Sequence, residues 1–269
     1  MMINKRLLTK WMIACCVGAW LSGCVTVDNS GRNITRFKDR SRSEIEQESM
    51  RIKTQLAVEY MNARDYRAAT RTIESVIQQN PSYEMAWLIR AQIYQHLKTF
   101  DKAEESFKKA LALSPNNAEI NNNYGWFLCG VMNKPTAGIA YFDKALADPT
   151  YPTPEISYLN KGICTAKSGQ NNMADAYFER ALQNNPDFIP VYKERARAFL
   201  GAGKNIEADQ QFRQYQSRVN ALNPDDLLLG WKIANANGET HAAYEYELQL
   251  KTNFPYSDEL KLLSTGNAE

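Results

Sequence analysis

The stretch that decides the fold covers residues 84–117 and reads EMAWLIRAQIYQHLKTFDKAEESFKKALALSPNN. Small and bulky apolar residues alternate along it at helical spacings, and a proline follows the second apolar run. Because proline cannot continue the hydrogen-bond ladder of a helix, this pattern predicts two helices and then a stop. The residues that mark the pattern are Trp87, Ala91, Tyr94, Ala103, Phe107, Ala110 and Pro115.

The same pattern recurs along the chain with a regular period. Ala57, Ala91 and Gly125 follow one another at a constant interval, and the same interval separates Gly162 from Ala196. This 34-residue period of small residues, aromatic residues and proline is typical of the tetratricopeptide repeat (TPR), a hairpin of two antiparallel helices. One hairpin cannot bury its apolar face alone, so the hairpins must stack. The sequence therefore predicts an all-α fold, a right-handed TPR superhelix of about six helix-turn-helix repeats.

Six repeats account for residues 50–257, and residues 258–269 are left as a short cap or tail. The interval between the third and fourth repeats, from Gly125 to Gly162, is three residues longer than the period. We assign one extra residue to the turn at 133–136 and two to the proline-rich loop at 149–154. The sixth repeat looks degenerate, with Trp231 in a small-residue position. The predicted repeats are residues 50–83, 84–117, 118–152, 155–188, 189–222 and 224–257.

The N-terminal residues have the pattern of a bacterial lipoprotein signal. Basic residues precede the apolar stretch Trp11–Leu21, whose 11 residues are too few for a bilayer span of about 20. The sequence Leu-Ser-Gly-Cys then ends at Cys24 and matches a lipobox, in which the cysteine thiolate accepts the lipid. We expect residues 1–23 to be a cleaved signal peptide and Cys24 to be lipidated. An ordinary signal peptide or a transmembrane anchor is the alternative.

The mature chain would then hang from a membrane by acyl chains such as palmitate, through a flexible tether at residues 24–49. Residue 25 is valine, whereas an aspartate there tends to retain such lipoproteins in the inner membrane. The sequence therefore favours the periplasmic face of the outer membrane.

Composition argues against several classes of function. The formal net charge is +2, which lacks the basic excess of a nucleic-acid binder. The two histidines fall in different repeats, and no cluster has the spacing of metal ligands. No nucleophile elbow or phosphate-binding glycine loop is present. We expect a binding protein without catalytic activity, metal or cofactor.

In a TPR superhelix, the first helix of each hairpin faces the concave side of the stack. Its inward positions are unusually apolar in the middle of the array, and such strips often bind other proteins. We predict that an apolar peptide or an amphipathic helix binds there. The alternative is that these side chains pack on one another. The predicted groove residues are Met85, Leu88, Gln92, Asn122, Trp126, Leu159 and Ile163. The fifth and sixth repeats are more polar, with Lys193, Arg197, Asp225 and Lys232.

Cys129 and Cys164 lie on the first helices of the third and fourth repeats, which are neighbours in the predicted stack. Two cysteines in an oxidising compartment favour a disulfide. The alternative is a pair of buried free thiols.

Residues 121–129 read NNNYGWFLC, which is not a general repeat pattern. This segment resembles the signature of the type IV pilus biogenesis and stability lipoproteins, the pilotins PilF and PilW. The resemblance covers nearly the whole chain, and it implies an outer-membrane lipoprotein that helps the pilus secretin to reach the membrane or to form multimers. Other pilus assembly proteins are further candidate partners. The alternative is a different envelope TPR lipoprotein that serves β-barrel assembly or cell-wall hydrolases.

Overall fold

The computed structural model describes residues 41–265. By their contacts these residues divide between Met50 and Arg51 into an N-terminal unit and a main unit. The predicted signal peptide, Cys24 and the tether as far as residue 40 lie outside the described residues.

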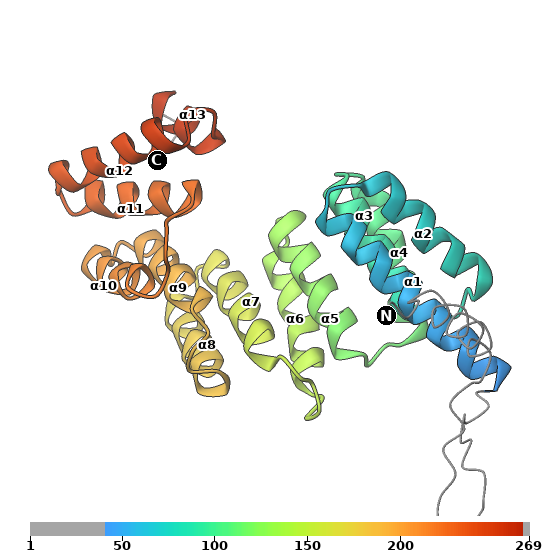
Figure 1. Cartoon of the computed structure of the whole chain (residues 1–269). Helices are drawn as coiled ribbons and strands as arrows, with labels where there is room; N and C mark the ends of the chain where they lie inside the picture. Colours follow the sequence, from blue (N-terminus) through green and yellow to red (C-terminus); the bar gives the residue numbers. More distant parts are fainter. Residues whose placement is uncertain (1–40, 266–269) are drawn as a thin grey trace, which may run out of the picture. The chain divides into compact units, whose positions relative to one another are not determined.

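The described residues form helices and connecting turns, and the helices follow one another as six helix-turn-helix units and a short last helix (Figure 1). This confirms the predicted all-α repeat fold. In chain order the elements are α1 (Arg42–Asn62), α2 (Tyr66–Gln79), α3 (Glu84–His96), α4 (Phe100–Leu113), α5 (Ala118–Trp126) continued by the π-helix η1 (Phe127–Val131), α6 (Pro135–Leu146), α7 (Pro154–Lys167), α8 (Asn171–Asn184), α9 (Pro190–Gly201), α10 (Asn205–Gln216), α11 (Pro224–Ala236), α12 (Thr240–Asn253) and α13 (Asp258–Ser264).

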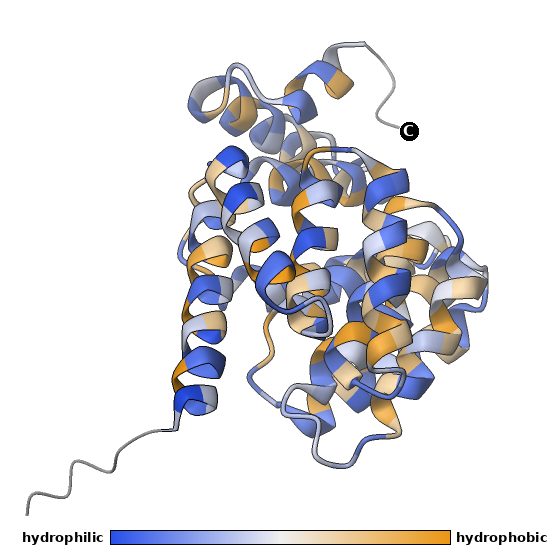
Figure 2. Cartoon of the chain, turned by 90° about the vertical axis from the view of Figure 1, so that its right-hand side faces the viewer, coloured by the Kyte–Doolittle hydropathy of each residue, from blue (hydrophilic) through white to orange (hydrophobic). Residues whose placement is uncertain are grey.

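Within the main unit, each second helix contacts both its own first helix and the first helix of the next hairpin, from α4 to α10. The first helices also contact one another directly, α5 with α7, α7 with α9 and α9 with α11. They therefore form the inner layer of the stack. Hydrophobic and hydrophilic residues alternate along each helix, as expected when only one side faces the core (Figure 2).

One steric rule repeats through the core. In the third, fourth and sixth repeats, the small residue of the first helix lies against an aromatic ring of the second helix. A Cβ atom added to Gly125 would lie 2.9 Å from the Phe142 ring, and one added to Gly162 would lie 2.6 Å from the Phe178 ring. Both rings are fully buried. The small residues are thus required because the ring occupies the space that a larger side chain would fill.

The closest approach of two helices is at Gly138 in α6. A Cβ atom there would lie 2.5 Å from the carbonyl oxygen of Gly125 and 2.9 Å from Cβ of Cys129. Backbone atoms cannot move aside as a flexible side chain can. Gly138→Ala is therefore expected to lower the free energy of unfolding by about 1–3 kcal/mol, although alanine has the higher helix propensity by about 1 kcal/mol. Urea unfolding followed by circular dichroism measures the change.

Gly201 provides the matched control, because no heavy atom lies within 4 Å of the Cβ position there. Gly201→Ala is expected to leave stability unchanged or to raise it by up to about 1 kcal/mol. If both variants were more stable than the wild type, the close contact at Gly138 would not constrain the fold.

The extra residue of the third repeat lies within the first helix, so its predicted place in the turn at 133–136 is wrong. The N–H of Met132 donates to the carbonyl of Phe127 at 2.9 Å, five residues earlier, and this forms the π-turn of η1. A π-turn holds one residue more than an α-turn. The first three side chains of this π-helix, Phe127, Leu128 and Cys129, are all buried.

The register of the sixth repeat also differs from the prediction. Gly230 lies one repeat period after Ala196, and a Cβ atom on it would lie 2.7 Å from the Tyr246 ring. Gly230 is therefore the small residue of this repeat, and the assignment of Trp231 to that position is wrong. The repeat starts at Asn223 instead of residue 224. Asn223 caps α11, since its side chain accepts from the N–H of Asp226.

Residues 42–49 are helical, since α1 begins at Arg42, so the prediction of a flexible tether is wrong for these residues. The reason is a capping box. The Ser41 hydroxyl accepts from the N–H of Glu44 at 3.2 Å, and the Glu44 carboxylate accepts from the N–H of Ser41 at 2.8 Å. This exchange satisfies donors that a helix start otherwise leaves unpaired.

Candidate functional site

One position of each first helix remains accessible on the inner layer, and we call this set of side chains the inner lane. Successive members are one repeat period apart, with three residues more between the third and fourth repeats, and every member is partly exposed. The inner lane consists of Val58, Gln92, Trp126, Ile163, Arg197 and Trp231.

The predicted groove is only partly accessible. Met85, Gln92, Trp126 and Ile163 are partly exposed, but Leu88 and Leu159 are buried. The prediction of a continuous apolar strip is therefore wrong, and the alternative of mutual packing holds at these two positions. The physical reason is that the hairpins stack closely enough for both leucines to join the core. Leu88 belongs to a cluster with Phe107 and Ile120, and Leu159 to one with Phe178.

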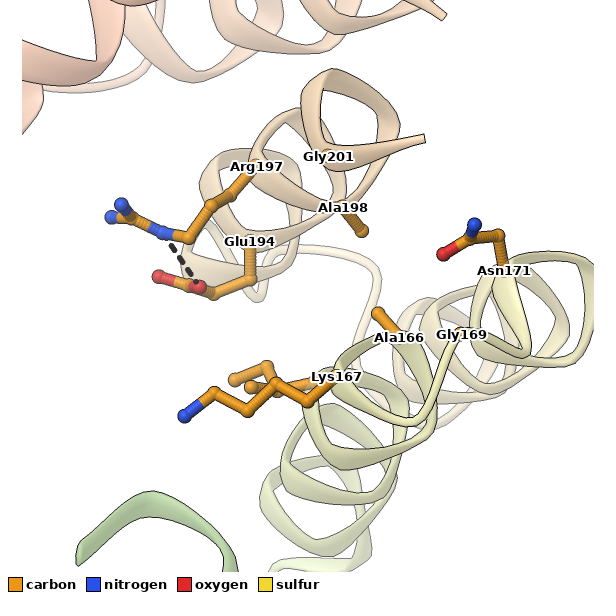
Figure 3. Close-up of a pocket in the computed structure, with 9 residues that line it drawn as sticks. Ala166, Lys167, Gly169, Asn171, Glu194, Arg197, Ala198 and Gly201 are labelled. Carbon is orange, nitrogen blue, oxygen red and sulfur yellow. Dashed lines mark hydrogen bonds and ion pairs between the residues drawn. The ribbon is translucent and has the colours of Figure 1, made fainter. Parts of the chain in front are cut away.

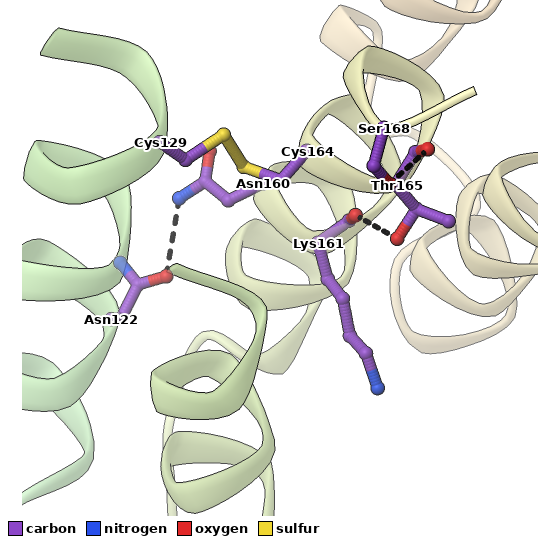
Figure 4. The surroundings of a disulfide bond; sticks show 7 residues. All are labelled: Asn122, Cys129, Asn160, Lys161, Cys164, Thr165 and Ser168. Carbon is purple, nitrogen blue, oxygen red and sulfur yellow. Dashed lines mark hydrogen bonds between the residues drawn. A yellow bond between two sulfur atoms is a disulfide. The ribbon is translucent and has the colours of Figure 1, made fainter. Parts of the chain in front are cut away.

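Asn122 is buried and ties two first helices together. Its side-chain oxygen accepts from the Asn160 amide at 3.1 Å (Figure 4), and it also accepts from the Ser157 hydroxyl at 2.9 Å. One repeat earlier, the Gln92 amide donates to the side-chain oxygen of Asn123 at 2.8 Å. Buried amides need such partners. The predicted contact residue Asn122 thus has a structural role between α5 and α7.

Gln92 and Asn122 also line a hollow of about 670 Å³ that is bordered by the loop between α6 and α7. Its other lining groups are mostly polar, and they include the carboxyl group of Glu119. Burial raises the pKa of Glu119. This part of the inner layer is therefore a polar hollow instead of the apolar one that we predicted.

Cys129 and Cys164 form a disulfide that joins η1 to α7, with 6.0 Å between the two Cα atoms (Figure 4). Both cysteines are fully buried, and they share a small core with Phe142. Trp126 packs against this core and keeps part of its surface exposed.

A second accessible part of the inner layer lies further along the chain, where two mostly apolar hollows adjoin α9. One hollow of about 290 Å³ lies between α7 and α9, and one of about 690 Å³ lies between α9 and α11. Both are lined by Arg197 and Gly201, so we treat them as one feature, the α9 groove. Its lining residues are Ile163, Ala166, Lys167, Gly169, Asn171, Glu194, Arg197, Ala198, Leu200, Gly201, Leu229, Trp231, Lys232 and Asn235.

Sequence reasoning named Ile163, Arg197 and Lys232 but missed Gly201 and Trp231 as groove residues. The signal for Trp231 was present, because it lies one repeat period after Arg197. The error in the register of the sixth repeat concealed it.

Figure 3 shows Ala166 and Ala198 facing each other across the smaller hollow, with Lys167, Glu194 and Arg197 extending on one side of it. The Arg197 guanidinium donates to Glu194 at 3.2 Å and to Asp225 at 2.9 Å. Hence the carboxylates beside the groove already have cationic partners.

Lys193 lies behind these groups and joins α9 to α11. Its ammonium group contacts the carboxylate of Asp225 at 2.7 Å and also that of Asp226. Burial alone would lower the pKa of Lys193, but the hydrogen bonds to both aspartates outweigh it and raise the pKa. For Asp225, burial acts to raise the pKa, and the hydrogen bond from Lys193 and the charge of Arg197 lower it overall. The charges of Lys193, Asp225 and Asp226 are therefore paired with one another between α9 and α11 and are not available to a ligand.

Lys167 and Lys232 differ from Lys193. Neither of their ammonium groups has a hydrogen bond or an ion pair with another side chain between residues 41 and 265. Three of the four charged side chains that line the α9 groove are cationic, and the single carboxylate is held by Arg197. The groove is therefore an apolar hollow with a positive rim.

Two other kinds of site are absent from the described residues. Over residues 41–265, no helix has both the length and the hydropathy needed to cross a membrane. The same residues contain no group of three histidine, cysteine or carboxylate side chains placed to hold a metal ion.

Comparison with known proteins agrees with this geometry. Tetratricopeptide repeat models match residues 54–118 and residues 156–188. The crystal structure of PilW, a widely conserved type IV pilus biogenesis factor, is 59% identical in sequence to this chain, and the match covers 80% of this chain and 98% of PilW with a TM-score of 0.74. The chain belongs to the PilW family of type IV pilus biogenesis proteins.

A second relative, PilF, is less similar in sequence. The type IV pilus assembly protein PilF of Pseudomonas aeruginosa is 28% identical over 237 residues, which are 88% of this chain and 90% of PilF. The solved structure of Pseudomonas aeruginosa PilF has a TM-score of 0.66 and 25% identity, and it matches 82% of this chain and 99% of that one. The family resemblance predicted from residues 121–129 is confirmed.

Proposed function

We propose that this PilW-family chain is a non-enzymatic scaffold, anchored by lipid on Cys24 to the outer membrane, that binds the type IV pilus secretin and assists its localisation or multimer assembly. The observation that carries the proposal is the 59% identity to PilW over nearly all of that chain. The lipobox ending at Cys24 supports the membrane anchor, and the anchor would hold the repeats in the periplasm, where a secretin subunit is accessible.

The inner layer supports binding more than catalysis. Its hollows are lined by apolar and cationic side chains that suit the side chains of a polypeptide. The two histidines have other roles. The His96 ring stacks on Tyr66 with 5.7 Å between centroids, and His241 lies 3.4 Å from Glu245 on the exposed side of α12.

Deletion of the gene tests the proposal. We expect the deletion strain to lose surface pili and the secretin multimers that resist detergent, and the wild-type gene to restore both. Electron microscopy and gel electrophoresis without heating measure the two results. Normal multimers together with a general loss of outer-membrane proteins would contradict the proposal and favour a role in β-barrel assembly.

Cys24→Ala tests the anchor separately. We expect this variant to be absent from the outer-membrane fraction and to restore few secretin multimers. The matched control is Cys15→Ala, which removes a cysteine from the same N-terminal segment but leaves the lipobox and the disulfide intact. If the Cys24→Ala protein still fractionated with the outer membrane, lipid would not be its anchor.

A further inference from the structure

The α9 groove combines two properties that point to a particular ligand chemistry. Its floor is apolar, from Leu200 and Leu229 on one side of Arg197 and Ile163 on the other. Its rim carries Lys167 and Lys232, which have no ionic partner among the residues that the structure describes. Since an unpaired ammonium group near an apolar surface is attracted to anions with reduced competition from water, the groove favours a negatively charged ligand.

Trp231 supplies the aromatic surface of the groove. It belongs to the inner lane, is partly exposed, and lines the larger hollow of about 690 Å³. Tryptophan and arginine are enriched among the residues that contribute most to protein interfaces. Trp231 and Arg197 both line this hollow, and its volume is ample for a large apolar side chain of a partner.

We propose that the α9 groove binds an acidic segment of a partner polypeptide, with one large apolar side chain against Trp231 and flanking carboxylates paired with Lys167 and Lys232. The proposal rests on the proposed function only in taking the partner to be a polypeptide. Charge complementarity decides the occupant, because the sole lining carboxylate, Glu194, is paired with Arg197 and leaves the positive charge uncompensated. A basic or purely apolar segment would leave Lys167 and Lys232 without partners.

Gly201 offers a way to block the groove without disturbing the fold. It lines both hollows, and no heavy atom lies within 4 Å of its Cβ position. A phenylalanine side chain at this position would occupy the groove and not the core. Gln210→Phe is the matched control, since Gln210 belongs to α10 of the same hairpin and lines neither hollow.

The test uses the full-length protein in detergent and an array of random 12-residue peptides. We expect the bound peptides to be enriched in aspartate and glutamate around a large apolar residue. For the best of them, we expect Gly201→Phe and the double variant Lys167→Gln/Lys232→Gln each to weaken binding by at least about tenfold in fluorescence anisotropy. Gln210→Phe should bind as the wild type does.

Three results would overturn the inference: bound peptides no more acidic than the array as a whole, no bound peptides, or equal binding by Gly201→Phe and the wild type. Circular dichroism of each variant confirms folding. These outcomes are independent of the gene-deletion test. Loss of pili in the deletion strain with no acidic peptide bound would retain the scaffold function and reject this groove as its acidic-segment site.

Discussion

Lys193→Met is expected to lower the free energy of unfolding by about 3–5 kcal/mol, because it leaves a buried carboxylate without its cation. The Asp226 side chain is only 1% exposed and that of Lys193 is 13% exposed. One oxygen of Asp226 accepts from the Tyr215 hydroxyl at 3.1 Å and from the N–H of Asn223 at 2.9 Å. The other oxygen faces the ammonium group of Lys193. Methionine fills a similar volume but supplies neither charge nor donor.

Lys232→Met is the control for this prediction. Lys232 belongs to the next repeat, is partly exposed and has no ionic partner among residues 41–265. We expect its replacement to change stability by no more than about 0.5 kcal/mol. Urea unfolding of both variants measures the difference. Equal stability of the two variants would show that the ion pairs of Lys193 with Asp225 and Asp226 do not hold the fifth and sixth repeats together.

The ion-pair cluster of Lys193, Asp225 and Asp226 also makes the free energy of unfolding depend on pH, and the sign of this dependence follows from the pKa shifts. The pKa of Asp225 is lowered in the folded state, so its contribution is present above the ordinary aspartate pKa of about 3.9 and is lost as the pH falls through the folded value. The pKa of Lys193 is raised, so its contribution is present below about 10.4 and is lost as the pH rises through the folded value. Between these limits the cluster contributes fully, and Lys193→Met should flatten both limbs of the stability profile.

The fold was largely predictable because the residues that mark the repeat period are required for steric reasons. An aromatic ring such as Phe178 requires a small partner such as Gly162, and the same pairing recurs between Gly125 and Phe142 and between Gly230 and Tyr246. The stack follows, since no single hairpin buries its own face. Local steric rules of this kind can be recognised without coordinates.

The candidate site was harder to predict because accessibility depends on how closely neighbouring hairpins approach. Leu88 and Ile163 both stand at inward positions of the repeat, yet Leu88 is fully buried and Ile163 lines a hollow. A shift of one residue also has large consequences on a helix, where each residue turns by about 100°. That shift moved Trp231 from an assumed core position to the inner lane.

The ion pairs could not be predicted from the sequence either. Lys193, Arg197 and Asp225 were recognised as polar inward residues, but the sequence does not say which cation pairs with which carboxylate. The pairing depends on the rotation of α11 against α9. Only once that rotation is known do Lys167 and Lys232 stand out as cations without partners among the described residues.

Removal of the disulfide by Cys129→Ala with Cys164→Ala is expected to cost about 2–4 kcal/mol of unfolding free energy. The bond closes a loop between residues 35 apart in sequence, which restricts the unfolded chain. Its location adds a local effect. The third and fourth repeats are joined by a connection, 147–153, with no helix, so the disulfide and the Asn122 hydrogen bonds tie η1 and α5 directly to α7. Amide hydrogen exchange should therefore increase more in η1 and α7 than in α3.

The single variants distinguish this explanation from simple loss of packing. Either Cys129→Ala or Cys164→Ala breaks the same bond, so each alone is expected to cost nearly as much as the double variant, and the two effects are not additive. If the two cysteine side chains contributed only as buried apolar groups, the losses of unfolding free energy in the single variants would add. A reducing agent would then leave the stability of the wild type unchanged. We expect instead that reduction destabilises the wild type to the level of the double variant, with no effect on that variant. Additive costs, or a wild type insensitive to reduction, would contradict a role for the covalent bond and assign the stability of this junction to the side chains around Phe142 and Asn122.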